Sequence, residues 1–110
     1  MGVFAAEFGM TAALSFIIFS LTDEEKSVPS AAVPALIGAT VTALVAPFAA
    51  VTGCGMNPAR DLGPRLVTAF CGWGSAALSR AWWTYTLGPL CGAVFGGGLH
   101  EWTFKKKKDK

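Results

Sequence analysis

An irregular, polar stretch lies between long apolar segments of this chain, and few folds can accommodate such a stretch. Residues 53–61 read Gly-Cys-Gly-Met-Asn-Pro-Ala-Arg-Asp, and no charged residue lies between Lys26 and Arg60. In a soluble domain, glycines followed by an Asn-Pro pair mark an ordinary surface turn. Within a membrane, irregular backbone is tolerated only where it is buried in protein or lines a cavity. The stretch therefore indicates a pore-lining loop of a membrane protein.

The composition agrees with a membrane protein. Hydrophobic residues make up 53% of the 110 residues and charged residues only 15%, and the mean hydropathy is +0.49. These values are more apolar than those of an average soluble domain, and the length allows one domain. The three cysteines are widely spaced and there is a single histidine, a pattern that predicts neither a disulfide framework nor a metal site. We expect no cofactor and no nucleic-acid partner.

Three segments are apolar enough to predict membrane-spanning helices, residues 2–21, 31–51 and 81–100, and Glu7 is the only charged residue within them. Twenty helical residues extend about 30 Å, the thickness of a hydrocarbon core. Aromatic residues at both ends of the third segment, Tyr85 among them, fit the interfacial belts of membrane helices. The alternative for each segment is a buried helix of a soluble protein.

Small residues recur at every fourth position from Gly88 to Gly96 and from Gly38 to Ala46. Such ridges let helix backbones approach closely, which is how helices in lipid gain packing energy. The alternative is the general enrichment of glycine in membrane helices. The ridges predict that the third and second segments pack in a compact bundle.

A shorter helix is expected between the second and third segments. Asn57 is a good N-cap and Pro58 a good first-turn residue. A helix from Pro58 to about Ala69 is roughly 18 Å long, about half a membrane. Its N-terminal N–H groups and the Asn57 carboxamide can donate hydrogen bonds to a passing oxygen atom. The sequence thus predicts an all-α membrane protein with three transmembrane helices and one re-entrant half-helix, whose loop and helix occupy about residues 52–69.

The motif Asn57-Pro58-Ala59-Arg60 resembles the second signature loop of the major intrinsic proteins, the aquaporin and aquaglyceroporin channels. Asp61 and the Leu-Gly-Pro-Arg that follows it resemble the glycerol-conducting branch, since water-selective members usually carry a small residue there. The resemblance extends over nearly the whole chain. It implies the second half of a six-helix fold built from two inverted repeats, each with its own Asn-Pro-Ala loop. A single copy of such a half encloses no pore.

The resemblance also implies roles for the loop residues. Asn57 would donate a hydrogen bond to the permeating hydroxyl group, and Arg60 would form the donor side of the selectivity filter and repel cations. The acceptors would be the backbone carbonyls of Gly53, Cys54, Gly55 and Met56.

Four further residues take roles from the resemblance. Cys54 and Val45 fall at positions where family members place residues of the selectivity filter. Glu7 falls where family members bury a glutamate that accepts backbone N–H groups of the pore loop; the alternative is an interfacial, hydrated carboxylate. Asp61 would be a structural first-turn acid that complements the N-terminus of the half-helix.

Two functions follow as alternatives. The first is a passive channel for glycerol, water and other small neutral solutes, present here as a half-channel or fragment. The second is a non-conducting truncated paralogue that co-assembles with or regulates full-length channels. The expected partners are the missing N-terminal half or a full-length paralogue, within a homotetramer of complete channels. An enzyme is not expected, because the sequence offers no nucleophile–base pair and His100 stands alone at a membrane edge.

A basic tail closes the chain, residues 103–110, with five of the nine basic residues at Lys105 to Lys108 and Lys110. Its simplest reading is anchoring on the cytoplasmic face of the plasma membrane. Lys107 and Lys108 stand fourth and third from the end and resemble a dilysine retrieval signal for the endoplasmic reticulum. Binding to anionic lipids is a third alternative.

Overall fold

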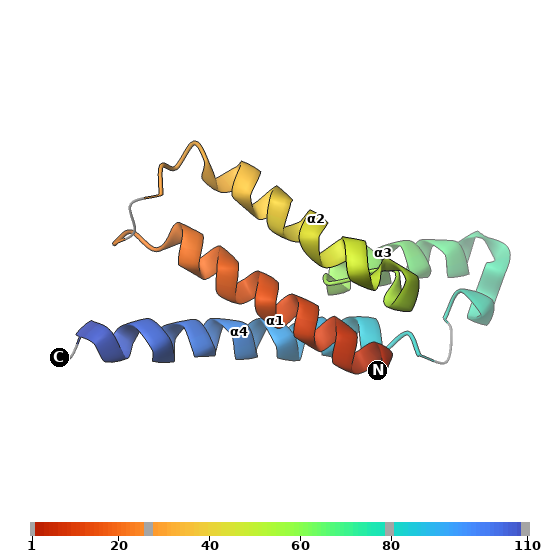
Figure 1. Cartoon of the computed structure of the whole chain (residues 1–110). Helices are drawn as coiled ribbons and strands as arrows, with labels where there is room; N and C mark the ends of the chain where they lie inside the picture. Colours follow the sequence, from red (N-terminus) through yellow and green to blue (C-terminus); the bar gives the residue numbers. More distant parts are fainter. Residues whose placement is uncertain (1, 26–27, 79–80, 109–110) are drawn as a thin grey trace.

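The computed structural model describes residues 2–25, 28–78 and 81–108, without the side chains of residues 105–108. All regular structure in these ranges is helical, which confirms the all-α class (Figure 1). Four α-helices and two short helical turns follow one another along the chain: α1 (Val3–Thr22), α2 (Val33–Thr52), α3 (Pro58–Thr68), η1 (Ala69–Trp73), η2 (Gly74–Ala77) and α4 (Thr84–Lys108). The side chains of the basic tail, Lys105 to Lys108 and Lys110, lie outside the described part.

Two of the described helices, α1 and α2, are long and apolar enough to cross a membrane. The third predicted segment also forms a helix, but α4 begins at Thr84 and continues to Lys108. Within the described chain α4 does not reach the same apolarity, because its many glycines and His100 dilute its aliphatic residues. By length and composition, two of the three predicted membrane-spanning segments, α1 and α2, could therefore cross a membrane.

The most extensive helix contact joins α1 and α4, which cross in Figure 1. A Cβ atom added at Gly92 would overlap the carbonyl oxygen of Phe8, and one at Gly96 would overlap that of Ala12. The Ser15 hydroxyl donates a 2.9 Å hydrogen bond to the Ala93 carbonyl across the same contact. The predicted packing ridge on this segment is confirmed, since only glycine allows this approach.

Helix α2 is far less covered, and among the described helices its backbone approaches only that of α1 closely. A Cβ atom added at Gly38 would meet nothing within 4 Å, so the second ridge makes no close approach there to the described residues, and its packing stays a prediction. Large apolar side chains are exposed on several elements, among them Val51, Val67 and Phe70. Exposed apolar surface of this extent indicates contact with lipid or with another protein.

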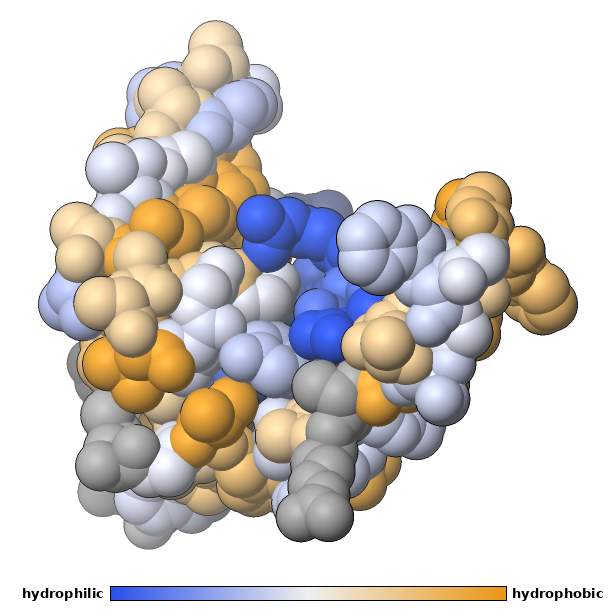
Figure 2. Space-filling view, turned by 90° about the vertical axis from the view of Figure 1, so that its right-hand side faces the viewer, coloured by the Kyte–Doolittle hydropathy of each residue, from blue (hydrophilic) through white to orange (hydrophobic). Residues whose placement is uncertain are grey.

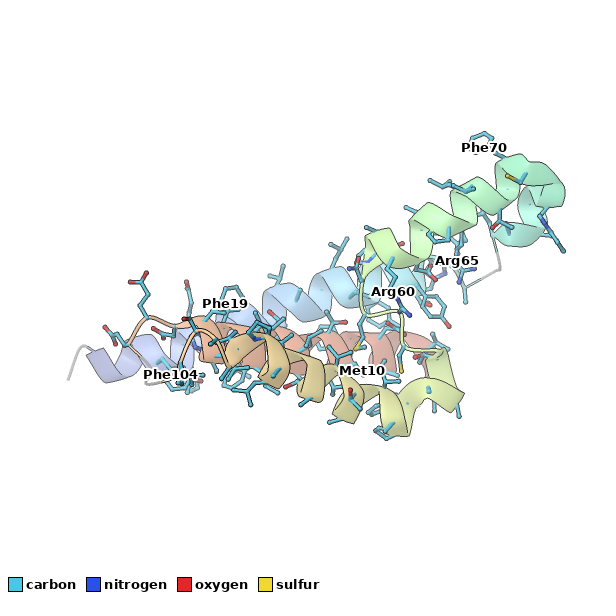
Figure 3. All side chains as sticks on the ribbon, turned by 90° about the horizontal axis from the view of Figure 1, so that it is seen from above. Met10, Phe19, Arg60, Arg65, Phe70 and Phe104 are labelled. Atoms are coloured by element: carbon cyan, nitrogen blue, oxygen red, sulfur yellow. The ribbon has the colours of Figure 1, made fainter. Side chains whose placement is uncertain are left out.

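His100 does not stand alone, contrary to the expectation from sequence. The residue is 8% exposed and its ring lies against the rings of Phe16, Phe19 and Phe104. Its Nε2 atom lies 3.9 Å from Oδ2 of Asp23. This aromatic cluster joins the C-terminal end of α1 to α4, and its Phe19 and Phe104 lie well away from Arg60 (Figure 3).

Candidate functional site

The loop that leads from α2 to α3 has an unusual backbone. Helix α2 ends at Thr52, and Gly53 caps it with φ 76° and an N–H group that donates to the Ala49 carbonyl. Cys54 and Met56 also have positive φ, 55° and 49°. Non-glycine residues pay a steric cost in this left-handed region. The loop conformation therefore depends on contacts from outside the loop.

Glu7 of α1 provides two of these contacts. Its carboxylate is 0% exposed; Oε1 accepts a 3.0 Å hydrogen bond from the Gly55 N–H and Oε2 a 2.7 Å bond from the Met56 N–H. Hydrogen bonds to a carboxylate are about twice as strong as neutral ones. A Cβ atom added at Gly55 would lie 2.9 Å from Cδ1 of Tyr85 and 3.2 Å from Oε2 of Glu7, so a side chain there would force these groups to shift.

Thr52 and Tyr85 hold the start of the loop, and the sequence analysis did not identify either as a site residue. The Thr52 hydroxyl accepts a 2.9 Å hydrogen bond from the Cys54 N–H. The Thr52 carbonyl accepts a 2.7 Å bond from the Tyr85 hydroxyl. Tyr85 was expected in an interfacial aromatic belt, and no local pattern indicates that its hydroxyl reaches a residue 33 positions earlier.

Arg60 extends back from α3 to the loop. Its Nη1 atom donates to the carbonyls of Cys54, at 2.7 Å, and Gly55, at 3.2 Å. A guanidinium group carries five N–H donors. Within the described residues the Nε and Nη2 groups of Arg60 make no hydrogen bond, and the residue is exposed. The site thus presents a fixed cation with unused donors beside the loop.

Asn57 caps α3. Its Oδ1 atom accepts hydrogen bonds from the N–H groups of Ala59, at 3.0 Å, and Arg60, at 3.2 Å. Pro58 follows in the first turn, where its missing N–H group costs nothing. Because the oxygen of the carboxamide is used in the cap, its NH₂ group points away from the helix end and is free to donate. Asn57 is exposed.

Asp61 lies in the first turn of α3 and also forms an ion pair with Arg65 one turn later. The pair is bidentate, with Oδ2 2.7 Å from Nε and Oδ1 3.0 Å from Nη2. The Arg65 guanidinium lies 5.3 Å from the centre of the Tyr85 ring and donates to the Ala77 carbonyl at 3.3 Å. In Figure 3, Arg60 and Arg65 leave α3 on the same side and Phe70 points to the opposite side.

These residues surround an open cavity of about 320 Å³ with a mainly polar lining. Figure 2 shows strongly hydrophilic residues gathered in a hollow with hydrophobic surface on both sides. The cavity brings together the following predicted and unpredicted residues: Thr52, Gly53, Gly55, Arg60, Asp61, Arg65 and Tyr85.

Seven predicted site residues do not line this cavity: Glu7, Val45, Cys54, Met56, Asn57, Pro58 and Ala59. Asn57 lies at the helix end beside it. The Cys54 side chain is 2% exposed, and its Sγ atom lies 3.8 Å from both the Met10 Sδ atom and the Val45 carbonyl oxygen. The thiol therefore packs between α1 and α2, and only the carbonyl of Cys54 faces Arg60. Val45 lies on α2 behind this contact.

In the described residues the fold and the site define a helical protein with two helices apolar enough to cross a membrane, in which a glycine-rich loop leads into a short, capped helix. Residues 1–100 match the family model described as "Major intrinsic protein", and the chain belongs to this family. Members of this family are channels and not enzymes, which confirms the prediction made from the sequence.

The relatives place the chain on the aquaglyceroporin-like side of the family. It is 38% identical to aquaporin-9 of Mus musculus over 103 residues, which cover 90% of this chain and 35% of that protein. It is 37% identical to the glycerol uptake facilitator protein of Haemophilus influenzae over 107 residues, 96% of this chain and 40% of the relative. The chain thus spans 35% and 40% of the length of these two relatives. No solved structure matches it.

Proposed function

We propose that this chain is the second half of a passive channel for glycerol, water and similar small neutral solutes. The observation that carries the proposal is the Arg60 guanidinium, bound to the carbonyls of Cys54 and Gly55 and directed at a polar cavity. The names of the relatives, aquaporin-9 and glycerol uptake facilitator protein, support the same class of solute.

The chemistry of the loop suits a neutral hydroxyl-bearing solute. In the proposed pore, the Asn57 amide and the free N–H groups of Arg60 donate to the solute oxygen, and the carbonyls of residues 53–56 accept from its hydroxyl hydrogens. A cation meets the fixed charge of Arg60 and the positive end of α3, which together oppose its passage. Glu7 and Asp61 support this arrangement without touching the solute.

In this proposal α4 is the third transmembrane helix and α3 is the re-entrant half-helix. The tight packing of α4 along α1 supports the first assignment. The length of α3, 11 residues, supports the second, because it corresponds to only about 16 Å. Cys54 and Val45 would set the width of the filter from behind the loop, through the contacts of the Cys54 thiol with Met10 and with the Val45 carbonyl, rather than by contact with the solute.

The exposed side of α2 and the open cavity require a partner in a conducting assembly. We propose that the missing N-terminal half, or a full-length paralogue, covers them, within a homotetramer of complete channels. The basic tail would lie in the cytoplasm, at the plasma membrane or, through Lys107 and Lys108, in the endoplasmic reticulum. The same exposure of α2 favours the second candidate function, a non-conducting module that co-assembles with full-length channels.

Two measurements test the proposal. An antibody against the lysine-rich tail gives the mass of the native membrane polypeptide, either near the 11.5 kDa of this sequence or larger. That polypeptide is then reconstituted in liposomes, together with the partner that co-purifies with it if its mass is near 11.5 kDa, and glycerol and water fluxes are followed by light scattering. Fluxes above those of protein-free liposomes are expected. Fluxes equal to those of protein-free liposomes would reject conduction and leave the co-assembling module.

A further inference from the structure

We propose that Tyr85 is a positioning residue that sets the solute preference of the loop, an inference that rests on the proposed function of that loop. The Tyr85 hydroxyl donates to the carbonyl of Thr52, the last residue of α2, at 2.7 Å. Helices α2 and α4 do not otherwise pack against each other in the described chain. This hydrogen bond therefore ties the end of α2, where the loop begins, to the helix that packs along α1.

This hydrogen bond is the first of a series of connected hydrogen bonds that ends at Arg60. The hydroxyl of Thr52 accepts from the Cys54 N–H at 2.9 Å, and the Cys54 carbonyl accepts from Nη1 of Arg60 at 2.7 Å. Cys54 has φ 55°, a conformation that its own backbone does not favour. Because each hydrogen bond orients the next, a shift of Thr52 moves the carbonyl that holds the guanidinium.

The ring of Tyr85 acts on the other side of the loop. A Cβ atom at Gly55 would lie 2.9 Å from Cδ1 of Tyr85, so the ring lies directly against the loop backbone. Its other neighbour is the Arg65 guanidinium, 5.3 Å from the ring centre and paired with Asp61. Tyr85 therefore separates the loop from α3 and lines the same cavity as Arg60. Its position determines how wide that cavity is.

The substitution Tyr85→Phe tests the hydroxyl without removing the ring. A matched control on the same helix is Thr103→Val, which removes a 2.7 Å hydroxyl bond to the Leu99 carbonyl far from the loop. Both variants are made in a polypeptide with Cys71→Ser and Cys91→Ser, since both thiols are free and exposed. The buried thiol of Cys54 then reports on the loop through its rate of alkylation by N-ethylmaleimide.

Tyr85→Phe is expected to raise the alkylation rate of Cys54 about fivefold, the factor that corresponds to the typical net free energy of one hydrogen bond. Thr103→Val is expected to leave the rate unchanged. Thr52→Val breaks the next hydrogen bond of the same series, so it is expected to raise the rate as well, even if Tyr85→Phe fails to fold. Rates equal to wild type in both Tyr85→Phe and Thr52→Val would overturn the proposal.

The second measurement is the ratio of glycerol to water permeability in liposomes. Tyr85→Phe is expected to change this ratio, whereas Thr103→Val is not. A parallel loss of both fluxes at a constant ratio would overturn the proposal, because it would indicate a structural role only. If the wild-type protein conducts nothing, the proposed function of the loop fails, and the alkylation rates still decide whether Tyr85 fixes the loop.

Discussion

Oε2 of Glu7 lies 2.7 Å from the backbone nitrogen of Met56, although 49 positions separate the two residues. A carboxylate on a membrane helix is costly unless it is fully hydrogen-bonded. Here the cost is offset by the N–H groups of Gly55 and Met56, which the left-handed loop directs at the carboxylate. The charge on α1 and the irregular backbone of the loop thus depend on each other.

Replacing Glu7 by Gln is expected to destabilise the protein by about 2 kcal/mol, since the amide keeps the shape but replaces one acceptor oxygen by an NH₂ donor that faces a backbone N–H donor. Thermal unfolding of the purified polypeptide in detergent measures the change. Glu24→Gln, at an exposed position beyond the end of α1, is the control and is expected to have no effect. Equal unfolding temperatures for Glu7→Gln and wild type would contradict the support role of Glu7.

Replacing Arg60 by Val is expected to raise proton leak about tenfold, the change that corresponds to a barrier lowered by about 1.4 kcal/mol. The fixed charge and its bonds to Cys54 and Gly55 are both lost. Decay of a pH gradient across liposomes measures the leak, with glycerol flux recorded in the same preparation. Arg60→Lys keeps the charge without the planar donor group, so its proton leak is expected to be smaller than that of Arg60→Val. Identical leak in Arg60→Val and wild type would exclude Arg60 from the pore.

The ion pair of Asp61 and Arg65 is expected to contribute about 1 kcal/mol of coupling, because its side chains are partly exposed, 16% and 24%. A double-mutant cycle with Asp61→Asn and Arg65→Gln isolates this energy from the bond of Arg65 to Ala77. The free energy of unfolding is measured for the wild type and three variants. Additive effects of the two substitutions would show that the pair contributes nothing.

The crossing of α1 and α4 is expected to depend on Gly96 but not on Gly98. Gly96→Ala places a methyl group on the Ala12 carbonyl and is expected to cost about 1–3 kcal/mol, as overpacking does elsewhere. Gly98→Ala meets open space and is expected to stabilise the helix by up to about 1 kcal/mol. Thermal unfolding compares the two. A similar loss of stability in both variants would mean that the contact between α1 and α4 is not what makes Gly96→Ala destabilising.

The parts of the fold that follow from local chemistry could be predicted from sequence. The Asn57 cap and Pro58 define where α3 begins, and the ridge from Gly88 to Gly96 indicates where α4 meets α1. The contacts that fix the loop could not be predicted, because the hydroxyl of Tyr85 acts across 33 positions with no local signature. The burial of the Cys54 thiol depends in the same way on where α1 places Met10.

The backbone of the loop also limits how the protein can be redesigned. Cys54 and Met56 both adopt positive φ, where a β-branched side chain collides with its own backbone. Valine, isoleucine and threonine are therefore excluded at these two positions, whatever space lies around them. A redesign of the loop for another solute must use side chains that are unbranched at Cβ at these two positions. The backbone torsion angles therefore limit the choice of residue types before size or polarity is considered.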